Sequence, residues 1–170
     1  MKRILFIIMT VVLGLMVTAC GDTNATGYLH YVVLDNYEAQ NDNQDVNIYW
    51  DYEDREGNSS EDGDLYVSYI VYELSSSEYE KSTEAVKEQA QDRLVNVSHK
   101  NKDLKVGVSY FSYNEKACEY MLSTSFEIGG HYGSISVSVM DDDIQEHYEY
   151  DSARALEVTE EVLNSMSVEE

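Results

Sequence analysis

Hydrophobic and polar residues alternate along much of the chain, which is the pattern of β-strands that bury one face. Together with enrichment in aromatic and β-branched residues, it predicts strands at residues 28–34, 46–52, 104–110, 118–128 and 133–139. Residues 65–74 are apolar on both faces, as expected for a central strand covered on both sides. Gly129 and Gly130 can adopt the positive φ angles of a tight hairpin between the last two strands. The other face of the final strand is predicted to meet solvent through Tyr132, Ser134, Ser136 and Ser138.

Two segments instead repeat their hydrophobic residues every three or four positions, which indicates helices. The first helix is predicted to start at a capping box formed by Ser77 and Glu80 and to end near Val97. Its buried stripe is expected to consist of Tyr79, Thr83, Val86, Ala90 and Leu94. The last helix is predicted to be capped by Asp151 or Ser152. Its stripe is expected to consist of Leu156, Thr159, Val162, Leu163 and Met166.

The order of these elements predicts an α+β fold. Strands come first, then a helix, then a three-strand antiparallel meander, then the closing helix. We therefore expect a single domain over residues 28–170, with one antiparallel sheet of about five to six strands, an inner helix and a C-terminal helix. A polar stretch at residues 36–45 is expected to be a loop, and an acidic hairpin loop is expected at 53–64.

The first nineteen residues have the features of a signal peptide rather than of a folded element. Lys2 and Arg3 precede an uncharged run from Ile4 to Ala19, which would be about 24 Å long as a helix and so shorter than a bilayer core of about 30 Å. The run ends in Val17-Thr18-Ala19-Cys20, which resembles the bacterial lipobox. The resemblance implies that diacylglycerol is transferred to Cys20 and that the chain is cut after Ala19. Less favoured alternatives are a transmembrane anchor and a plain secretory signal.

Cleavage at this site predicts a mature protein held at the extracytoplasmic face of the cell membrane by fatty acyl chains, such as palmitate, on Cys20. Residues 20–27 would form a lipidated tether, whose seven polar residues after Cys20 reach about 15 Å as a flexible coil. Nine of the eleven basic residues and all 33 acidic residues lie beyond Ala19, so the mature net charge is 9 − 33 = −24. Such a charge repels phosphate backbones and anionic lipid headgroups, and it argues against nucleic-acid binding.

The closing helix ends in Val162-Leu163-Asn164-Ser165-Met166, after an inner helix and a three-strand meander. This order and this C-terminal phrase resemble the PsbP-like family, over roughly residues 46–170. Members of this family often carry a proline and a tryptophan near the first strands, and of these two residues this sequence has only the tryptophan, Trp50. The resemblance implies a PsbP-like sandwich and a binding or assembly-accessory role rather than catalysis.

No residue pattern predicts an enzyme or a cofactor. With Cys20 lipidated, Cys118 has no second cysteine with which to form an intrachain disulfide, and its strand position favours core packing over a nucleophilic role. The histidines, at positions 30, 99, 131 and 147, show no ligand spacing.

Clustered carboxylates are the richest candidate chemistry. Asp141, Asp142 and Asp143 follow the last strand directly, and calcium prefers oxygen ligands of this kind. An EF-hand is excluded in the acidic loop, because Ser59 and Leu65 stand where glycine and glutamate are required. The alternative is a solvated acidic surface that keeps the protein soluble.

Tyrosine offers a second kind of contact surface. Residues of this type are favoured at protein interfaces, and four of them are candidates for a sheet face opposite the core, namely Tyr49, Tyr66, Tyr72 and Tyr113. The favoured alternative is that the terminal helix covers that face. The sequence thus favours a non-catalytic binding or assembly-accessory lipoprotein with a protein or cell-envelope partner, and a calcium-binding or calcium-sensing lipoprotein is the alternative.

Overall fold

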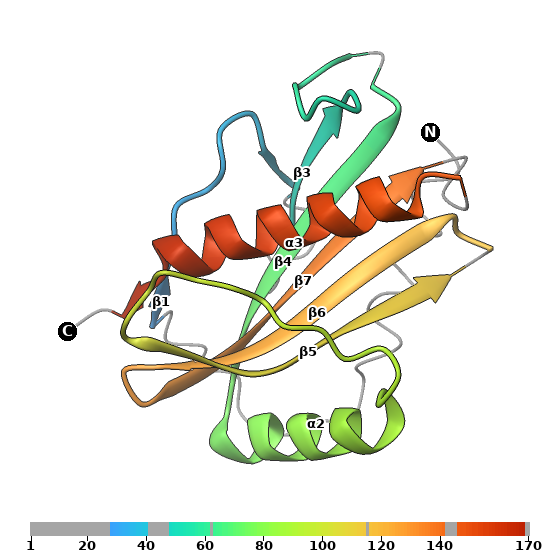
Figure 1. The fold of residues 1–170 in the computed structure, drawn as a ribbon. Coiled ribbons are helices and arrows are strands. Elements are labelled where there is room, and N and C mark those ends of the chain that lie inside the picture. Colours follow the sequence, from blue (N-terminus) through green and yellow to red (C-terminus); the bar gives the residue numbers. More distant parts are fainter. Residues whose placement is uncertain (1–27, 41–47, 62, 115, 142–145, 169–170) are drawn as a thin grey trace.

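The computed structural model describes residues 28–40, 48–61, 63–114, 116–141 and 146–168. Six antiparallel strands form one sheet in the order β2-β3-β4-β7-β6-β5. These strands are β2 (Glu38–Gln40), β3 (Ile48–Glu53), β4 (Leu65–Leu74), β5 (Leu104–Asn114), β6 (Glu119–Ile128) and β7 (His131–Asp141). Helix α3 (Tyr148–Ser165) lies across one face of the sheet, and α2 (Ser76–Gln89) lies on the other (Figure 1). The predicted α+β class is confirmed.

A second, two-stranded sheet joins the two ends of the domain. β1 (Leu29–His30) pairs with β8 (Ser167–Val168), so that Leu29 lies opposite Val168. The backbone amide of Val32 then donates to Ser165 Oγ at 3.1 Å, and that of Leu34 donates to the hydroxyl of Tyr69 at 3.2 Å. The segment that follows β1 is therefore held against the end of α3 and the middle of β4.

The hydrophobic core lies between α3 and the sheet. The helix buries Ala155, Val158, Val162 and Leu163 completely, because they recur at helical spacing on one side. From the sheet they meet residues of alternate positions, which include Val67, Leu122, Phe126, Ile135, Val137 and Val139, all fully buried. The alternation in the sequence therefore identifies the core face of the central strands.

The predicted meander and its hairpin are confirmed. β6 and β7 pair from Ile128–His131 to Glu119–Met140, and Gly129 and Gly130 join them with φ angles of 57° and 84°. At Gly133, a side chain would meet the carbonyl oxygen of Tyr72 at 2.8 Å and the Phe126 ring at 2.6 Å. Glycine is thus required there because a neighbouring backbone and an aromatic ring approach it closely.

Several element boundaries differ from the prediction. The capping box is formed by Ser75 and Glu78, two residues before the expected pair, and the helix ends at Gln89 rather than near Val97. Beyond it the chain turns back along β5, where the amide of Val95 donates to the carbonyl of Ser109, and sheet-type bonds replace helical ones. The strand expected over residues 28–34 is limited to β1, and β2 lies in a region expected to be a loop.

The last helix also starts earlier than predicted. Its N-cap is His147, without a side-chain capping bond, and Asp151 lies inside the first turn. Of the two helices among the described residues, neither is long and apolar enough to cross a bilayer.

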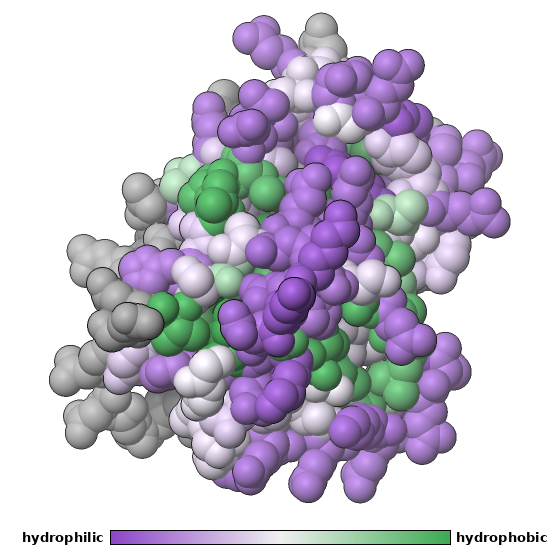
Figure 2. Space-filling model, turned by 60° about the vertical axis from the view of Figure 1, so that its left-hand side comes forward, coloured by the Kyte–Doolittle hydropathy of each residue, from purple (hydrophilic) through white to green (hydrophobic). Residues whose placement is uncertain are grey.

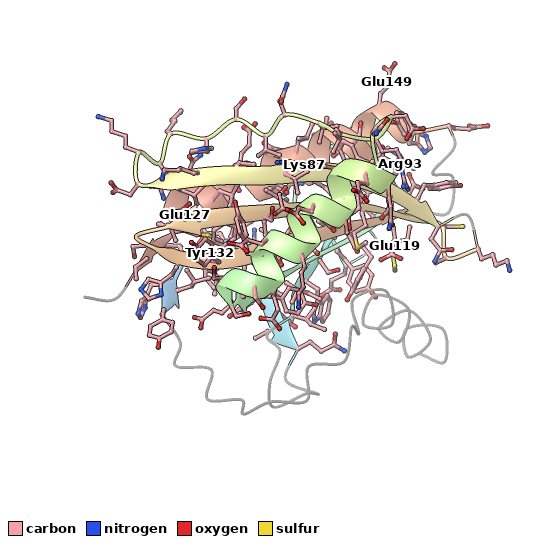
Figure 3. All side chains as sticks on the ribbon, turned by 90° about the horizontal axis from the view of Figure 1, so that it is seen from below. Lys87, Arg93, Glu119, Glu127, Tyr132 and Glu149 are labelled. Carbon is pink, nitrogen blue, oxygen red and sulfur yellow. The ribbon has the colours of Figure 1, made fainter. Side chains whose placement is uncertain are left out.

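The face of β7 that was expected to meet solvent is largely covered. Ser136 and Ser138 are buried, on the side of the sheet over which α2 lies (Figure 3). Ser136 Oγ lies 3.2 Å from Ser123 Oγ, and Ser138 donates to Glu119 Oε1 at 2.7 Å. Small hydroxyl side chains thus find polar partners on a buried face, which a polar pattern alone does not distinguish from exposure.

Candidate functional site

The densest group of charged side chains lies at one end of the domain, where the β3–β4 loop, the end of β7 and the start of α3 meet. We call this region the acidic end and define it as the described parts of residues 51–64 and 141–151. It contains ten acidic residues and one basic residue, Arg55. Two arginines from different elements, Arg154 of α3 and Arg55 of the β3–β4 loop, bind carboxylates of this region.

Arg154 of α3 binds Glu53 at the end of β3. Its Nε lies 2.7 Å from Glu53 Oε2, and its Nη2 lies 2.8 Å from Oε1, which is a two-pronged arginine–carboxylate pair. The hydroxyl of Tyr37 donates to the same Oε1 at 2.8 Å, and burial together with the Glu53 charge raises the pKa of Tyr37. Glu53 is 1% exposed, so its negative charge is tolerated in the core because these partners compensate it.

Arg55 binds Asp141 at the end of β7. Its Nη1 donates to Asp141 Oδ2 at 2.7 Å, and Nη2 lies 3.4 Å from Oδ1. Nδ1 of His147 lies 3.0 Å from the same Oδ2. Asp141 is 3% exposed. The arginine therefore ties the β3–β4 loop to the strand from which the candidate calcium cluster was predicted to extend.

Asp151 is the member of this group without a compensating bond. It is fully buried, and neither carboxylate oxygen has a hydrogen-bond partner among the described residues. Burial, reinforced by the charge of Asp141, raises the pKa of Asp151 to about 6, while Arg55 and His147 act in the opposite direction. At neutral pH the folded protein therefore carries, in the first turn of α3, a buried carboxylate that has no hydrogen-bond partner among the described residues.

The predicted calcium ligands are only partly accounted for. Asp141 is engaged by Arg55 and His147, and Asp142 and Asp143 lie outside the described residues. Within the described ranges, no three His, Cys, Asp or Glu side chains are placed to hold a metal ion together. The acidic end therefore contains two kinds of carboxylate. Glu53 and Asp141 are bound by arginine, whereas others, such as Glu56 and Glu149, are exposed.

A further buried carboxylate lies on the α2 side of the sheet, away from the acidic residues that face α3. Glu119, at the start of β6, is 5% exposed and accepts a bond from Ser138 (Figure 3). Burial raises its pKa, which the bond from Ser138 opposes. This side chain follows the turn that carries Cys118, whose φ angle is 49°. Cys118 is half-buried and packs against the core cluster, in line with its predicted packing role.

The tyrosine surface is different from the one predicted. Tyr49 stacks on Tyr69 on the core side, with ring centroids 5.0 Å apart, and Tyr113 faces the same side as Tyr120, so neither shares a face with Tyr66. Instead, Trp50, Tyr52 and Tyr66 form a half-buried aromatic group on the α2 side, including a Trp50–Tyr66 stack at 5.8 Å. Trp50 and Tyr52 are alternate residues of β3, and Tyr66 lies opposite Tyr52 on β4.

The opposite end of the domain has a different character. Four segments meet there, residues 28–34, 98–105, 128–132 and 163–168, and we call them the β1 end. They contain three lysines, Lys100, Lys102 and Lys105, and one acidic residue, Asp103, and in the sequence Asp35, Glu169 and Glu170 directly follow two of them. Since α3 spans 18 residues, the two ends are separated by about 27 Å.

Comparisons with known proteins give distant structural likenesses. No family model and no curated protein matches the sequence. A crystal structure of a protein from Bacteroides thetaiotaomicron VPI-5482 is 10% identical, with a TM-score of 0.45 and a match that covers 84% of this chain and 46% of that one. The chain therefore spans about half the length of that protein.

The solution structure of cyanobacterial PsbP (CyanoP) from Synechocystis sp. PCC 6803 is 11% identical, with a TM-score of 0.26 and a match that covers 90% of this chain and 99% of that one. Neither likeness carries an argument about function.

Proposed function

We propose that this protein is a lipoprotein, anchored through Cys20 at the extracytoplasmic face of the cell membrane. In this proposal its single PsbP-like domain acts as a non-catalytic binding or assembly-accessory module. The observation that supports it most is the difference between the two ends of the domain. The chain enters through β1 at one end, and the carboxylates concentrate at the other.

This difference between the ends follows from the position of β1. β1 pairs with β8, directly after α3, so a tether that leads into Tyr28 joins the domain at the β1 end. The acidic end then projects away from the membrane by about the length of α3, roughly 27 Å. An anchored protein with this geometry presents its exposed carboxylates to partners in the cell envelope.

The anchoring part of the proposal is tested by Cys20→Ser, with Cys118→Ser as the matched control. Wild type and the control are expected to sediment with membranes, and their N-terminal peptide is expected to carry the mass of a diacylglycerol. Cys20→Ser is expected to lose both properties, because a serine hydroxyl is not a substrate for thioether formation. Equal sedimentation and equal mass for Cys20→Ser and wild type would refute lipid anchoring.

The binding part is tested by site-specific crosslinking in native membranes. A photoreactive residue is placed at Glu56, which is exposed at the acidic end, and in a second strain at Glu84, which is exposed on α2. A partner of the acidic end gives a discrete adduct from position 56 and none from position 84. Absence of any adduct from position 56 contradicts the proposed use of this end.

A further inference from the structure

We infer that the partner of this domain is a protein segment rich in arginine, which binds a strip of aromatic residues and the carboxylate of Glu119 on the α2 side of the sheet. We call the strip the aromatic strip and define it as Trp50, Tyr52, Tyr66 and Met140. The inference rests on the proposed function and gives the chemistry of the partner, at the place where the acidic end borders this face of the sheet.

The strip and Glu119 are brought together by the register of four neighbouring strands. Tyr52 of β3 lies opposite Tyr66 of β4, Tyr66 lies opposite Met140 of β7, and Met140 lies opposite Glu119 of β6. Residues directly opposite one another point to the same face of a sheet, and neighbouring strands lie about 4.8 Å apart. Glu119 is therefore about 10 Å from Tyr66, a distance that about three residues of an extended peptide span.

The three rings of the strip pack against one another and keep part of their surface exposed. The Trp50 ring is stacked on that of Tyr66, with an angle of 21° between the planes and centroids 5.8 Å apart. The Tyr52 ring is tilted by 80° and 65° from these two rings. Each of the three side chains is half-buried. The face of such a ring attracts cations, and the planar guanidinium group of arginine stacks on it.

Glu119 supplies a negative charge that the described residues do not match with a positive one. Its side chain is 5% exposed, and Oε1 accepts a bond from Ser138 at 2.7 Å. No lysine, arginine or histidine among the described residues forms an ion pair with it, in contrast to Glu53 and Asp141. Burial raises the pKa of Glu119, because the ionised carboxylate is poorly solvated, and the bond from Ser138 opposes this. A guanidinium group from a partner stabilises the ionised form, as Arg154 does for Glu53.

Helix α2 packs on a different part of this face. Thr83, the buried residue of α2, places Oγ1 3.4 Å from Ser125 Oγ. Ser125 is level with Tyr72 of β4, across β7, and Tyr72 is six residues from Tyr66. This contact therefore lies about 20 Å along the strands from the strip. In Figure 3, which views this face, Glu119 lies beside the ribbon of α2.

The segments that border the strip all carry more acidic than basic residues. The β3–β4 loop, residues 54–64, has five acidic residues against Arg55, which is itself bound to Asp141. Residues 115–119 have two against Lys116, and residues 84–93, at the end of α2, have three against two. Hydrophilic side chains also dominate the face drawn in Figure 2, in a chain with 33 acidic and 11 basic residues. This charge attracts a cationic segment and repels an anionic one.

The experiment measures the binding of an arginine octamer to the full protein in the presence of phosphatidylcholine vesicles. Trp50 is the single tryptophan of the chain, so its fluorescence reports binding at the strip. We expect a saturable change in this fluorescence and an affinity about threefold or more above that for a lysine octamer. A cation–π contact is worth about a factor of two to five in affinity, and arginine makes it more often than lysine. A diffuse negative field would instead bind both octamers equally.

Two variants identify the groups that bind. Glu119→Gln keeps the size of the side chain and removes its charge, and Tyr52→Leu removes one ring of the strip. Each is expected to weaken binding of the arginine octamer about threefold or more. The matched controls, Asp103→Asn and Tyr113→Leu, make similar changes at exposed positions away from the strip. They are expected to change the affinity by less than about 1.5-fold.

Equal affinity for the two octamers, or unchanged Trp50 fluorescence at saturation, would overturn the inference. Variants that bind as their controls do would also overturn it. If a variant fails to fold by circular dichroism, an octamer with a photoreactive group decides the question on the wild-type protein. Labelling within residues 48–53 or 64–68 supports the strip, and labelling confined to other segments overturns it. This binding requires neither lipid on Cys20 nor the adduct from position 56, so it can fail while the proposed function stands.

Discussion

The buried carboxylate of Asp151 gives the sharpest prediction about stability. Replacing it with asparagine keeps its shape and removes its charge. In the folded protein the pKa of Asp151 is raised from 3.8 to about 6, chiefly by burial and then by the charge of Asp141. In the unfolded chain the carboxylate is solvated and titrates near 3.8.

The direction of the effect follows from proton binding. Between about pH 4 and pH 6 the folded state holds a proton on Asp151 that the unfolded state has released, so the free energy of unfolding falls as pH rises. Above pH 6 both states are ionised and the loss is complete. A difference of about two pKa units at 1.36 kcal/mol each makes the loss about 3 kcal/mol at neutral pH. Below pH 4 the penalty is absent.

Asp151→Asn is therefore expected to increase the free energy of unfolding by up to about 3 kcal/mol at pH 7.5 and to change it little at pH 4. Urea unfolding of both proteins at several pH values, followed by circular dichroism, measures the difference. Glu149→Gln is the matched control, because this side chain is exposed in the same helical turn. Its removal is expected to cost less than about 1 kcal/mol through the helix dipole. A difference for Asp151→Asn that stays constant from pH 4 to 7.5 would refute the reasoning.

Three further predictions concern other parts of the domain. Arg154→Met is expected to lower the free energy of unfolding by about 3–5 kcal/mol in urea titrations, because Glu53 stays buried without its guanidinium; an effect equal to that of exposed Arg93→Met would contradict this. Gly133→Ala is expected to cost about 1–3 kcal/mol, since the new methyl group meets Tyr72 and Phe126, whereas a change below 0.5 kcal/mol would show that the strands move apart easily. Millimolar calcium is expected to leave the melting temperature unchanged at matched ionic strength, because Asp141 is already bound by Arg55; a specific rise would instead support the calcium alternative.

The sequence predicted the strands most reliably where the polarity of each residue alone decides whether it is buried. The core residues of β6 and β7 alternate with polar ones, and Gly129-Gly130 marks their turn, so these strands followed from local patterns. The start of α2 was misplaced by two residues because Ser75 with Glu78 and Ser77 with Glu80 both have the spacing of a capping box.

Prediction failed where a distant element changes what a side chain meets. Glu53 reads as part of an acidic loop, yet it is buried because Arg154, 101 residues away, supplies its counter-charge. Asp151 reads as a cap and is enclosed instead. Asp141 was identified as a candidate ligand, but the contact from Arg55 could not be foreseen, because it depends on how the β3–β4 loop folds over β7. Polarity patterns carry no information about such pairings.

The pairing of β1 with β8 also joins the two ends of the described chain. Each strand is only two residues long, so this ladder is the smallest among the described strands. It belongs to a sheet of its own, so its opening breaks no pairing of the six-stranded sheet. If the bonds of Val32 and Leu34 to Ser165 and Tyr69 opened with it, residues 28–36 would become an extended segment of up to about 30 Å while the core stayed folded.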